Sequence, residues 1–381
     1  MNILLIIRWP VGGIQTYCKY VYSLPLFDHC RFTVVTTTEA EDAYFKNAFG
    51  SKLGELIRLE EKTFTAASIL RIARRMSSRP QLIHAHGFSS GILAIPTKLW
   101  LGIPMILTSH DILQDSQFAG ATGVMKRFAL GTALTFSTCV NVVGNDAAQN
   151  LQSYFPRACS PKKLAIILNG IDVERFSEAQ PRDLRGELGL PRDTLLMGFF
   201  GRFMTQKGFK YILDMLDQRR QRLAGPVHVV CFGWGGFIRE EQAEIERRGL
   251  KSYFSFMPAT NEMPRVLKGC DVVLMPSLWE AMPLLAMEAL VAGAPLIATS
   301  CIGLKEVCLG SPAIVCAPGD SESLLEAVNT FFRERATREA QAEQYRGEAV
   351  RRFDRKRTAQ SLKNLYDSMV SSNGGLQCKT G

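Results

Sequence analysis

Residues 276–300 read PSLWEAMPLLAMEALVAGAPLIATS, and this stretch guides the interpretation of the rest of the chain. Pro283 suits the first position of a helix, where a missing N–H group costs nothing, and Gly293 marks the end of that helix. The helix is apolar nearly all round except for Glu288, so we expect it to be buried. An unpaired buried carboxylate costs roughly several kcal/mol, so Glu288 is expected to meet hydrogen-bond donors.

The start of this helix is predicted to bind an anion. Glu280 lies in the loop before the helix, so Glu280 and Glu288 flank the free backbone N–H groups of Leu284 and Leu285. A helix N-terminus carries about half a positive charge and attracts phosphate. The stretch therefore indicates a phosphate site with two acids beside it.

Two series of short apolar segments alternate with helical stretches along the chain. We expect strands at residues 3–7, 32–37, 82–85, 105–108, 140–143 and 164–168, and again at 195–200, 227–232, 254–256, 272–275, 295–299 and 313–315. Strands spaced by helices favour parallel sheets that are covered on both faces. We therefore predict an α/β protein with two Rossmann-like, doubly wound domains that face each other across a cleft.

Domain boundaries follow from this alternation. The first domain is expected to cover residues 1–176 and the second residues 194–350, with a polar linker that includes a short helix at 177–193. Residues 351–370 are expected to form a C-terminal helix. Residues 371–381 are rich in Gly and Ser and are predicted to be a disordered tail.

Chemistry-bearing residues gather at the predicted strand ends, where ligands bind in such sheets. Arg202 and Lys207 stand in a loop that enters a helix near Gly208, and two cations at a helix entrance suit a diphosphate. The other residues that follow or end predicted strands are Gly12, Gly13, His84, His86, His110, Asn145, Gly233 and Glu280. This convergence carries more weight than any one of these motifs.

His84 and His86 lie two apart on one strand, so both side chains point to the same face. No third ligand stands nearby and no Asp-x-Asp element occurs in the chain. A structural or cleft-lining role is therefore favoured over a metal pair, and we predict no metal site.

Composition indicates a globular protein with reduced cysteines. The ten cysteines show no paired Cys-x-x-Cys spacing, which favours a cytosolic enzyme. The opening run MNILLIIRWP is too short for a signal peptide, and no stretch has the length that spanning a bilayer requires. We expect a cytoplasmic protein that is soluble or peripheral to the membrane.

The net charge of +9 is uneven, because residues 1–175 carry 18 basic and 12 acidic side chains. A solvated surface explains this excess about as well as an anionic partner such as a membrane. Residues 66–79 form a basic amphipathic stretch, which indicates either a packed surface helix or membrane contact. Nucleic-acid binding is not expected, since no basic stripe contains interleaved aromatic residues.

The two glutamates separated by seven residues, preceded by Pro-Ser and followed by Ala-Leu, resemble the signature of the retaining glycosyltransferases of family 4. The segment NGIDVERF at 169–176 and the loop GRFMTQKG at 201–208 are also similar to elements of that family. Ala281 departs from it, because Gly often stands at that position in the family. The resemblance implies the GT-B fold, with the final helix crossing back onto the first domain.

The resemblance also implies a role for each candidate residue. Glu280 would face the donor sugar, Glu288 would bind the ribose, and Arg202 and Lys207 would neutralise the departing diphosphate. The helix start at Pro283, Leu284 and Leu285, with Gly233, Gly12 and Gly13, would bind the donor. His110 would approach the reacting sugar, and we place His86 and Asn145 on the acceptor side.

These inferences predict a retaining, metal-independent glycosyltransferase without a cofactor. It would move a hexose-type sugar from a nucleoside-diphosphate sugar, with a UDP-sugar favoured, to a glycan or lipid-linked acceptor at the inner face of the cell membrane. Cell-surface polysaccharide or lipopolysaccharide synthesis is the expected setting. Two alternatives remain: a sugar-nucleotide 2-epimerase of the same fold, and an inactive scaffold subunit that binds sugar nucleotides.

Overall fold

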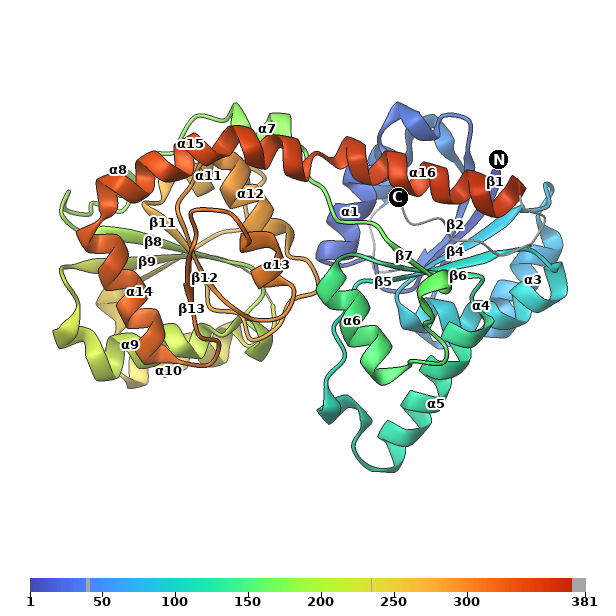
Figure 1. Cartoon of the computed structure of the whole chain (residues 1–381), viewed down its shortest axis with the longest axis horizontal. Coiled ribbons are helices and arrows are strands. Elements are labelled where there is room, and N and C mark those ends of the chain that lie inside the picture. Colours follow the sequence, from blue (N-terminus) through green and yellow to red (C-terminus); the bar gives the residue numbers. More distant parts are fainter. Residues whose placement is uncertain (39–41, 234, 372–381) are drawn as a thin grey trace. The chain divides into compact units, whose positions relative to one another are not determined.

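A computed structural model describes residues 1–38, 42–233 and 235–371 (Figure 1). The chain divides into two compact units, one made of Met1–Gly170 with the residues from Arg355 onward and the other of Ile171–Asp354. We call them the N-terminal unit and the C-terminal unit. Each contains one sheet, and all the strand pairs of both sheets within the described ranges are parallel.

The N-terminal unit has a seven-stranded sheet in the order β3-β2-β1-β4-β5-β6-β7. Its strands are β1 Asn2–Ile7, β2 Arg31–Thr37, β3 Leu53–Leu59, β4 Leu82–His86, β5 Met105–Ser109, β6 Cys139–Val142 and β7 Leu164–Ile166. The sequence pattern missed β3, which is an edge strand. Glu55 and Arg58 interrupt its apolar run, and it is only partly buried, so it lacks the continuous apolar pattern of the central strands.

Helices cover both faces of this sheet. They are α1 Gly13–Tyr22, α2 Asp42–Phe49, α3 Ala66–Arg75, α4 Phe88–Leu101, α5 Gly120–Phe136, α6 Asn145–Tyr154 and α16 Arg355–Ser371. Side chains of β1 alternate between the two faces: Ile3 and Leu5 pack with α1, α2 and α16, whereas Leu4 and Ile6 pack with α3 and α4. The buried residues of α3 belong to this second cluster, so residues 66–75 of the basic stretch at 66–79 form a helix packed on the sheet.

Helix α16 is an integral part of the N-terminal unit and lies along α1 (Figure 1). It buries Leu362, Tyr366 and Met369 in the same cluster as β1, and the Thr358 hydroxyl donates to the Leu168 carbonyl over 2.7 Å. Ser371, predicted to begin the tail, is the last residue of this helix. The rest of the predicted tail, residues 372–381, lies outside the described residues.

The C-terminal unit has a six-stranded sheet in the order β10-β9-β8-β11-β12-β13. Its strands are β8 Leu195–Phe200, β9 Val227–Phe232, β10 Phe254–Met257, β11 Val272–Met275, β12 Leu296–Thr299 and β13 Ile314–Cys316. Its helices are α7 Val173–Ser177, α8 Leu184–Glu187, α9 Phe209–Arg219, α10 Ile238–Arg247, α11 Met263–Gly269, α12 Leu284–Ala292, α13 Leu304–Cys308, α14 Ser321–Arg333 and α15 Arg335–Phe353.

The segment predicted as a linker, residues 177–193, packs within the C-terminal unit. The Arg182 amide donates to the Arg265 carbonyl over 2.9 Å, and Arg185 forms a 2.6 Å ion pair with Asp271. The division between the units therefore falls after Gly170, six residues before the expected boundary. It falls again after Asp354, so residues 351–353 end α15 and do not begin the final helix.

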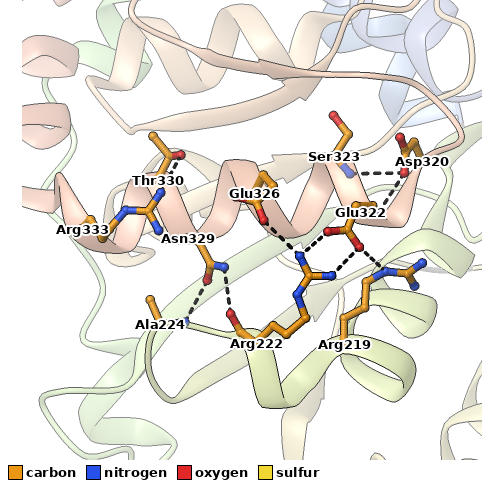
Figure 2. Close-up of polar contacts among 10 residues, drawn as sticks. All are labelled: Arg219, Arg222, Ala224, Asp320, Glu322, Ser323, Glu326, Asn329, Thr330 and Arg333. Carbon is orange, nitrogen blue, oxygen red and sulfur yellow. Dashed lines mark hydrogen bonds and ion pairs between the residues drawn. The ribbon is translucent and has the colours of Figure 1, made fainter.

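A polar brace joins α9 to α14 in the C-terminal unit (Figure 2). Glu322 accepts hydrogen bonds from Arg219 at 2.7 Å and from Arg222 at 2.5 Å. Buried Asn329 donates to the Arg222 carbonyl and accepts from the Ala224 amide. Exposed ion pairs contribute little stability, so the buried amide is the stronger restraint on the turn after α9.

Nine of the ten cysteines lie in the described part of the chain, and all nine are buried and form no disulfide there. Cys378 lies outside it. Among the helices of the described ranges, none combines the length and apolar character needed to cross a membrane.

Candidate active site

Both sheets have a topological switch point. The strands that follow the first strand are added on one side of it, and the later strands are added on its other side. In the C-terminal unit this point lies between β8 and β11, which are neighbours in the sheet. Ligands of doubly wound sheets bind at the carboxyl ends of such strands. The loop after β8 carries Arg202 and Lys207, and the loop after β11 carries Glu280. The topology therefore brings these predicted site residues to one edge.

Glu280 and Lys207 are in direct contact. The Lys207 ammonium donates to Oε1 of Glu280 over 2.7 Å, and the Ser277 hydroxyl donates to the same oxygen over 2.8 Å. The Glu280 side chain is 8% exposed, whereas that of Lys207 is 25% exposed. Taking a carboxylate out of water is costly unless it is paired and hydrogen-bonded, so these two donors explain how Glu280 is held.

Gly208 allows the two loops to approach each other closely. Its φ of +69° is left-handed, and a Cβ added there would lie 1.9 Å from the Pro276 carbonyl oxygen. Only glycine fits both conditions. The contact between Lys207 and Glu280 therefore depends on glycine at position 208.

Arg202 is partly buried and has no hydrogen bond or ion pair with the described residues. Its loop is held to the loop after β9, because the Gly201 amide donates to the Phe232 carbonyl over 3.0 Å. Gly233 packs so closely that a Cβ there would lie 2.1 Å from the Gly201 carbonyl oxygen. Trp234, the next residue of this loop, lies outside the described residues. The backbone is thus fixed while the guanidinium stays available for an anion.

Helix α12 begins at Leu284, so Pro283 is the N-cap residue and not the first helical residue as predicted. Its φ of −74° is that of any proline, but its ψ of 120° is extended, which places it outside the helix. No side chain caps this N-terminus and its first turn has no acidic residue. The amides of Leu284 and Leu285 are therefore available to an anion, and buried Glu288 follows in the second turn.

In the N-terminal unit, the switch point lies between β1 and β4. Gly12 follows β1 with a φ of +57° and is the N-cap of α1, and Gly13 is the first residue of this helix. No side chain caps α1 and its first turn contains no acid. One turn further on, the Tyr17 ring packs against His110 with 5.2 Å between ring centroids. Asn145 is exposed at the start of α6, after β6.

Three histidines of the N-terminal unit, His84, His86 and His110, contact one another and two tyrosines. Nδ1 of His86 lies 2.9 Å from Nε2 of His110, and Nε2 of His86 lies 2.8 Å from the Tyr22 hydroxyl. His84 contacts the Tyr366 hydroxyl through Nδ1 at 2.5 Å. Protein groups thus occupy both nitrogens of His86, and it lies behind His110 instead of lining an open surface. In the described part of the chain, no group of three or more His, Cys, Asp or Glu residues is placed to hold a metal ion.

Burial keeps these imidazoles neutral. It lowers the pKa of His110 to about 4, and burial with the neighbouring His110 lowers the pKa of His84 to about 3. Burial, His84 and His110 together hold the pKa of His86 well below its usual range. None of the three carries a proton charge at neutral pH, so they act here as hydrogen-bonding groups.

Sequence reasoning missed several residues that hold the site residues in place. Ser277 was visible only as part of the Pro-Ser pair, and Gln206, which donates to the Trp279 carbonyl over 2.8 Å, looked like an ordinary loop residue. Tyr22 and Tyr366 lie on apolar helix faces, where tyrosine most often signals core packing. No local pattern could have paired them with histidines, because Tyr366 is 282 residues from His84.

Comparisons with known proteins agree with this architecture. Residues 11–175 match the family model "Glycosyltransferase Family 4", and residues 194–334 match "Glycosyl transferases group 1". The chain is 26% identical over 251 residues to a D-inositol 3-phosphate glycosyltransferase of Segniliparus rotundus, covering 63% of this chain and 56% of that protein. It is 26% identical over 228 residues to an Escherichia coli UDP-Gal:alpha-D-GlcNAc-diphosphoundecaprenol alpha-1,3-galactosyltransferase, covering 58% of each chain.

Both matches span less than two thirds of the relative's own length. Among solved structures, Anabaena HepE in complex with UDP-glucose superposes with a TM-score of 0.80 at 22% identity, over 97% of this chain and 100% of that chain. The two family models together span most of both units, and the structural match extends over nearly the whole chain. The chain therefore belongs to the family 4, group 1 glycosyltransferases and has the GT-B fold.

Proposed function

We propose that this protein transfers a hexose-type sugar from a nucleoside-diphosphate sugar to a glycan or lipid-linked acceptor, with retention at the anomeric carbon. The observation that carries the proposal is the 2.7 Å pair between Lys207 and buried Glu280, at the switch point of the C-terminal unit. Two of the similar proteins support a UDP-sugar donor, since the E. coli galactosyltransferase uses UDP-Gal and the HepE structure contains UDP-glucose. The first of these also acts on a diphosphoundecaprenol-linked sugar, which supports a lipid-linked acceptor.

In the proposed reaction, the bond between the anomeric carbon and the diphosphate breaks as the acceptor oxygen attacks from the same face. The acceptor proton passes to the departing phosphate oxygen. Negative charge then develops on the diphosphate, where Arg202, Lys207 and the amides of Leu284 and Leu285 are assigned to stabilise it. Donors already in place stabilise such charge without reorganisation, and the proposed mechanism routes no step through a metal or cofactor.

The two acids are assigned to the two sugars of the donor. Glu280, fixed by Lys207 and Ser277, is proposed to orient the transferred sugar, and Glu288 is proposed to accept hydrogen bonds from the ribose hydroxyls. In the N-terminal unit, Gly12 and Gly13 are proposed to contact the donor through backbone amides. His110 is proposed to contact the reacting sugar, with Asn145 and His86 on the acceptor side and His86 acting through His110.

Product analysis tests this proposal. A thermal-shift panel of nucleoside diphosphates is expected to show the largest stabilisation with UDP. Incubation of an α-linked UDP-hexose with an acceptor should then yield an α-linked product by NMR. A β-linked product would contradict retention. Isomerised donor formed without any acceptor would establish the 2-epimerase, and binding without turnover would establish the scaffold subunit.

We further propose that α5 contacts the anionic inner face of the cell membrane. A lipid-linked acceptor would be held in that membrane. Val124, Met125 and Phe128 are 66%, 72% and 77% exposed on this helix. Lys126 and Arg127 are exposed between them. Exposed apolar side chains on both sides of a pair of cations suit the boundary between acyl chains and anionic headgroups.

Vesicle flotation tests the α5 contact. Binding is expected to phosphatidylglycerol vesicles, to weaken at high salt, and to be lost in Phe128→Ser combined with Val124→Ser. Leu309→Ser is the matched control, because Leu309 is 75% exposed in the C-terminal unit. Equal binding by the double variant and the control would refute the assignment to α5.

A further inference from the structure

A continuous set of hydrogen bonds runs through the N-terminal unit from His110 to Asn141. His110 Nε2 meets His86 Nδ1 at 2.9 Å, and His86 Nε2 meets the Tyr22 hydroxyl at 2.8 Å. The Tyr22 and Tyr366 hydroxyls lie 3.1 Å apart, and Tyr366 lies 2.5 Å from His84 Nδ1. His84 Nε2 lies 2.7 Å from the Thr108 hydroxyl, to which the Asn141 amide donates over 3.1 Å.

Every member of this set except His110 is fully buried. Charged imidazoles and phenolates are costly at such depth, so each member is neutral and each contact has one donor and one acceptor. A neutral imidazole donates through one nitrogen and accepts through the other. The direction of any one bond therefore sets the direction of all the others.

Asn141 sets that direction. Its amide nitrogen donates to the Thr108 oxygen, so the Thr108 hydroxyl proton is left to donate to His84 Nε2. If His84 donated instead, the Thr108 oxygen would accept two hydrogen bonds, and its own buried proton would have an acceptor only if the Asn141 amide turned over to present Oδ1, which in the structure is buried without a partner. A buried donor without an acceptor is strongly disfavoured. His84 is therefore protonated on Nδ1 and donates toward the tyrosines.

We propose that this chain of hydrogen bonds, pointing from Asn141 to His110, holds His110 as a neutral donor through Nδ1–H, with Tyr22 and His86 as its positioning residues. The Tyr22 hydroxyl donates to His86 Nε2, and His86 Nδ1–H donates to His110 Nε2. The proton of His110 then lies on Nδ1, which has no partner among the described residues. This nitrogen is left to donate to a sugar hydroxyl.

The inference deepens the proposed function, because it rests on His110 contacting the reacting sugar. It assigns His110 the work of a hydrogen-bond donor and excludes it as a general base. Protonating His110 at Nε2 would require every bond back to Thr108 to reverse. This chain of hydrogen bonds therefore favours a neutral His110, as does burial, which lowers the pKa of His110 to about 4.

The titratable groups that face this chain come from several elements. Tyr17 packs edge-on against His110 and its hydroxyl, buried, has no hydrogen-bond partner among the described residues. Burial raises the pKa of Tyr17, Tyr22 and Tyr366, so all three remain neutral. Two charged residues stand beside these elements in the sequence: Asp111, which follows His110, and Arg8, which follows β1 and lies 4.0 Å from Glu61.

Nitrogen NMR tests the tautomers directly on the full chain labelled with ¹⁵N-histidine. The sequence has five histidines, so the long-range proton–nitrogen spectrum is simple enough to assign by single substitutions. We expect His110 and His86 to be protonated on Nδ1 and unprotonated on Nε2. We also expect neither to titrate between about pH 8 and pH 5.5.

Two buried Tyr→Phe variants form a matched pair. In Tyr366→Phe, His84 Nδ1–H can donate directly to the Tyr22 hydroxyl 3.2 Å away, so the His110 tautomer should be unchanged. In Tyr22→Phe, Nε2 of His86 loses its donor and the direction is no longer set. His110 should then show a mixture of tautomers and begin to titrate above pH 5.5, and turnover should fall about tenfold with a new acid limb absent from Tyr366→Phe.

Three outcomes would overturn the inference: an Nε2-protonated His110, an ordinary titration of His110 in the unaltered protein, or equal tautomer shifts in the two variants. The expected tautomers together with normal activity of His110→Ala would mean something different. The proposed direction of the hydrogen bonds would then be correct, and the sugar contact assigned to His110 in the proposed function would be wrong.

Discussion

Replacing Lys207 with alanine should lower kcat about a hundredfold, while KM for the donor changes much less. The ammonium is assigned to charge that develops on the diphosphate only as the sugar departs. Its loss also removes the cation that lies 2.7 Å from Glu280, whose side chain is 8% exposed. Steady-state kinetics with the donor identified by thermal shift measures both effects.

Lys210→Ala is the matched control, because Lys210 is exposed in the first turn of α9, three residues beyond Lys207. It removes the same charge and should leave kcat within about twofold, since exposed charges a turn away are screened. Similar losses in the two variants would indicate a general field effect. Unchanged kcat in Lys207→Ala would contradict the assignment of Lys207 to the departing group.

Gly208→Ala should abolish most activity and destabilise the C-terminal unit by about 2–5 kcal/mol. Part of this free energy is the strain of a side chain at a φ of +69°. The larger part is the collision of the new Cβ with the Pro276 carbonyl oxygen, 1.9 Å away. The β11 loop must shift to relieve it, and Glu280 shifts with this loop. Equilibrium denaturation and kinetics measure the two consequences.

Gly310→Ala separates strain from collision. Gly310 has a φ of +75°, but a Cβ there would meet no atom within 4 Å. This variant should lose only about 1–2 kcal/mol and keep full activity. If Gly208→Ala behaved like Gly310→Ala, the close approach of the two loops would not be what sets Glu280.

The sequence predicted secondary structure best where a strand is fully buried and therefore consists of a short run of apolar residues. The strands of the C-terminal sheet were predicted to within one residue at each end, because each is a short apolar run between turn residues. The edge strand β3 was missed because it is only partly buried and its apolar run is interrupted by Glu55 and Arg58. Residues 177–193 were predicted to be a linker because they are polar, yet Arg182 and Arg185 make specific contacts within the C-terminal unit.

Some residues of the candidate site could likewise be predicted from the sequence, and others could not. Glu280, Lys207 and Arg202 could be found because their loops carry a local pattern of charge beside glycine and a helix start. The groups behind His110 could not, because their roles arise from contacts between distant segments. Tyr22 comes from the first helix of the chain and Tyr366 from the last, and only the folded sheet brings both to His84.

The placement of α16 affects the order in which this chain becomes structured on the ribosome. The C-terminal unit is one uninterrupted segment, Ile171–Asp354, which can fold as soon as it emerges. The first 170 residues emerge earlier, but Leu362, Tyr366 and Met369 complete their core from the far end of the chain. Vectorial synthesis therefore leaves an apolar surface beside β1 uncovered until α16 has been made, so the N-terminal unit completes its core only after the whole C-terminal unit has been synthesised.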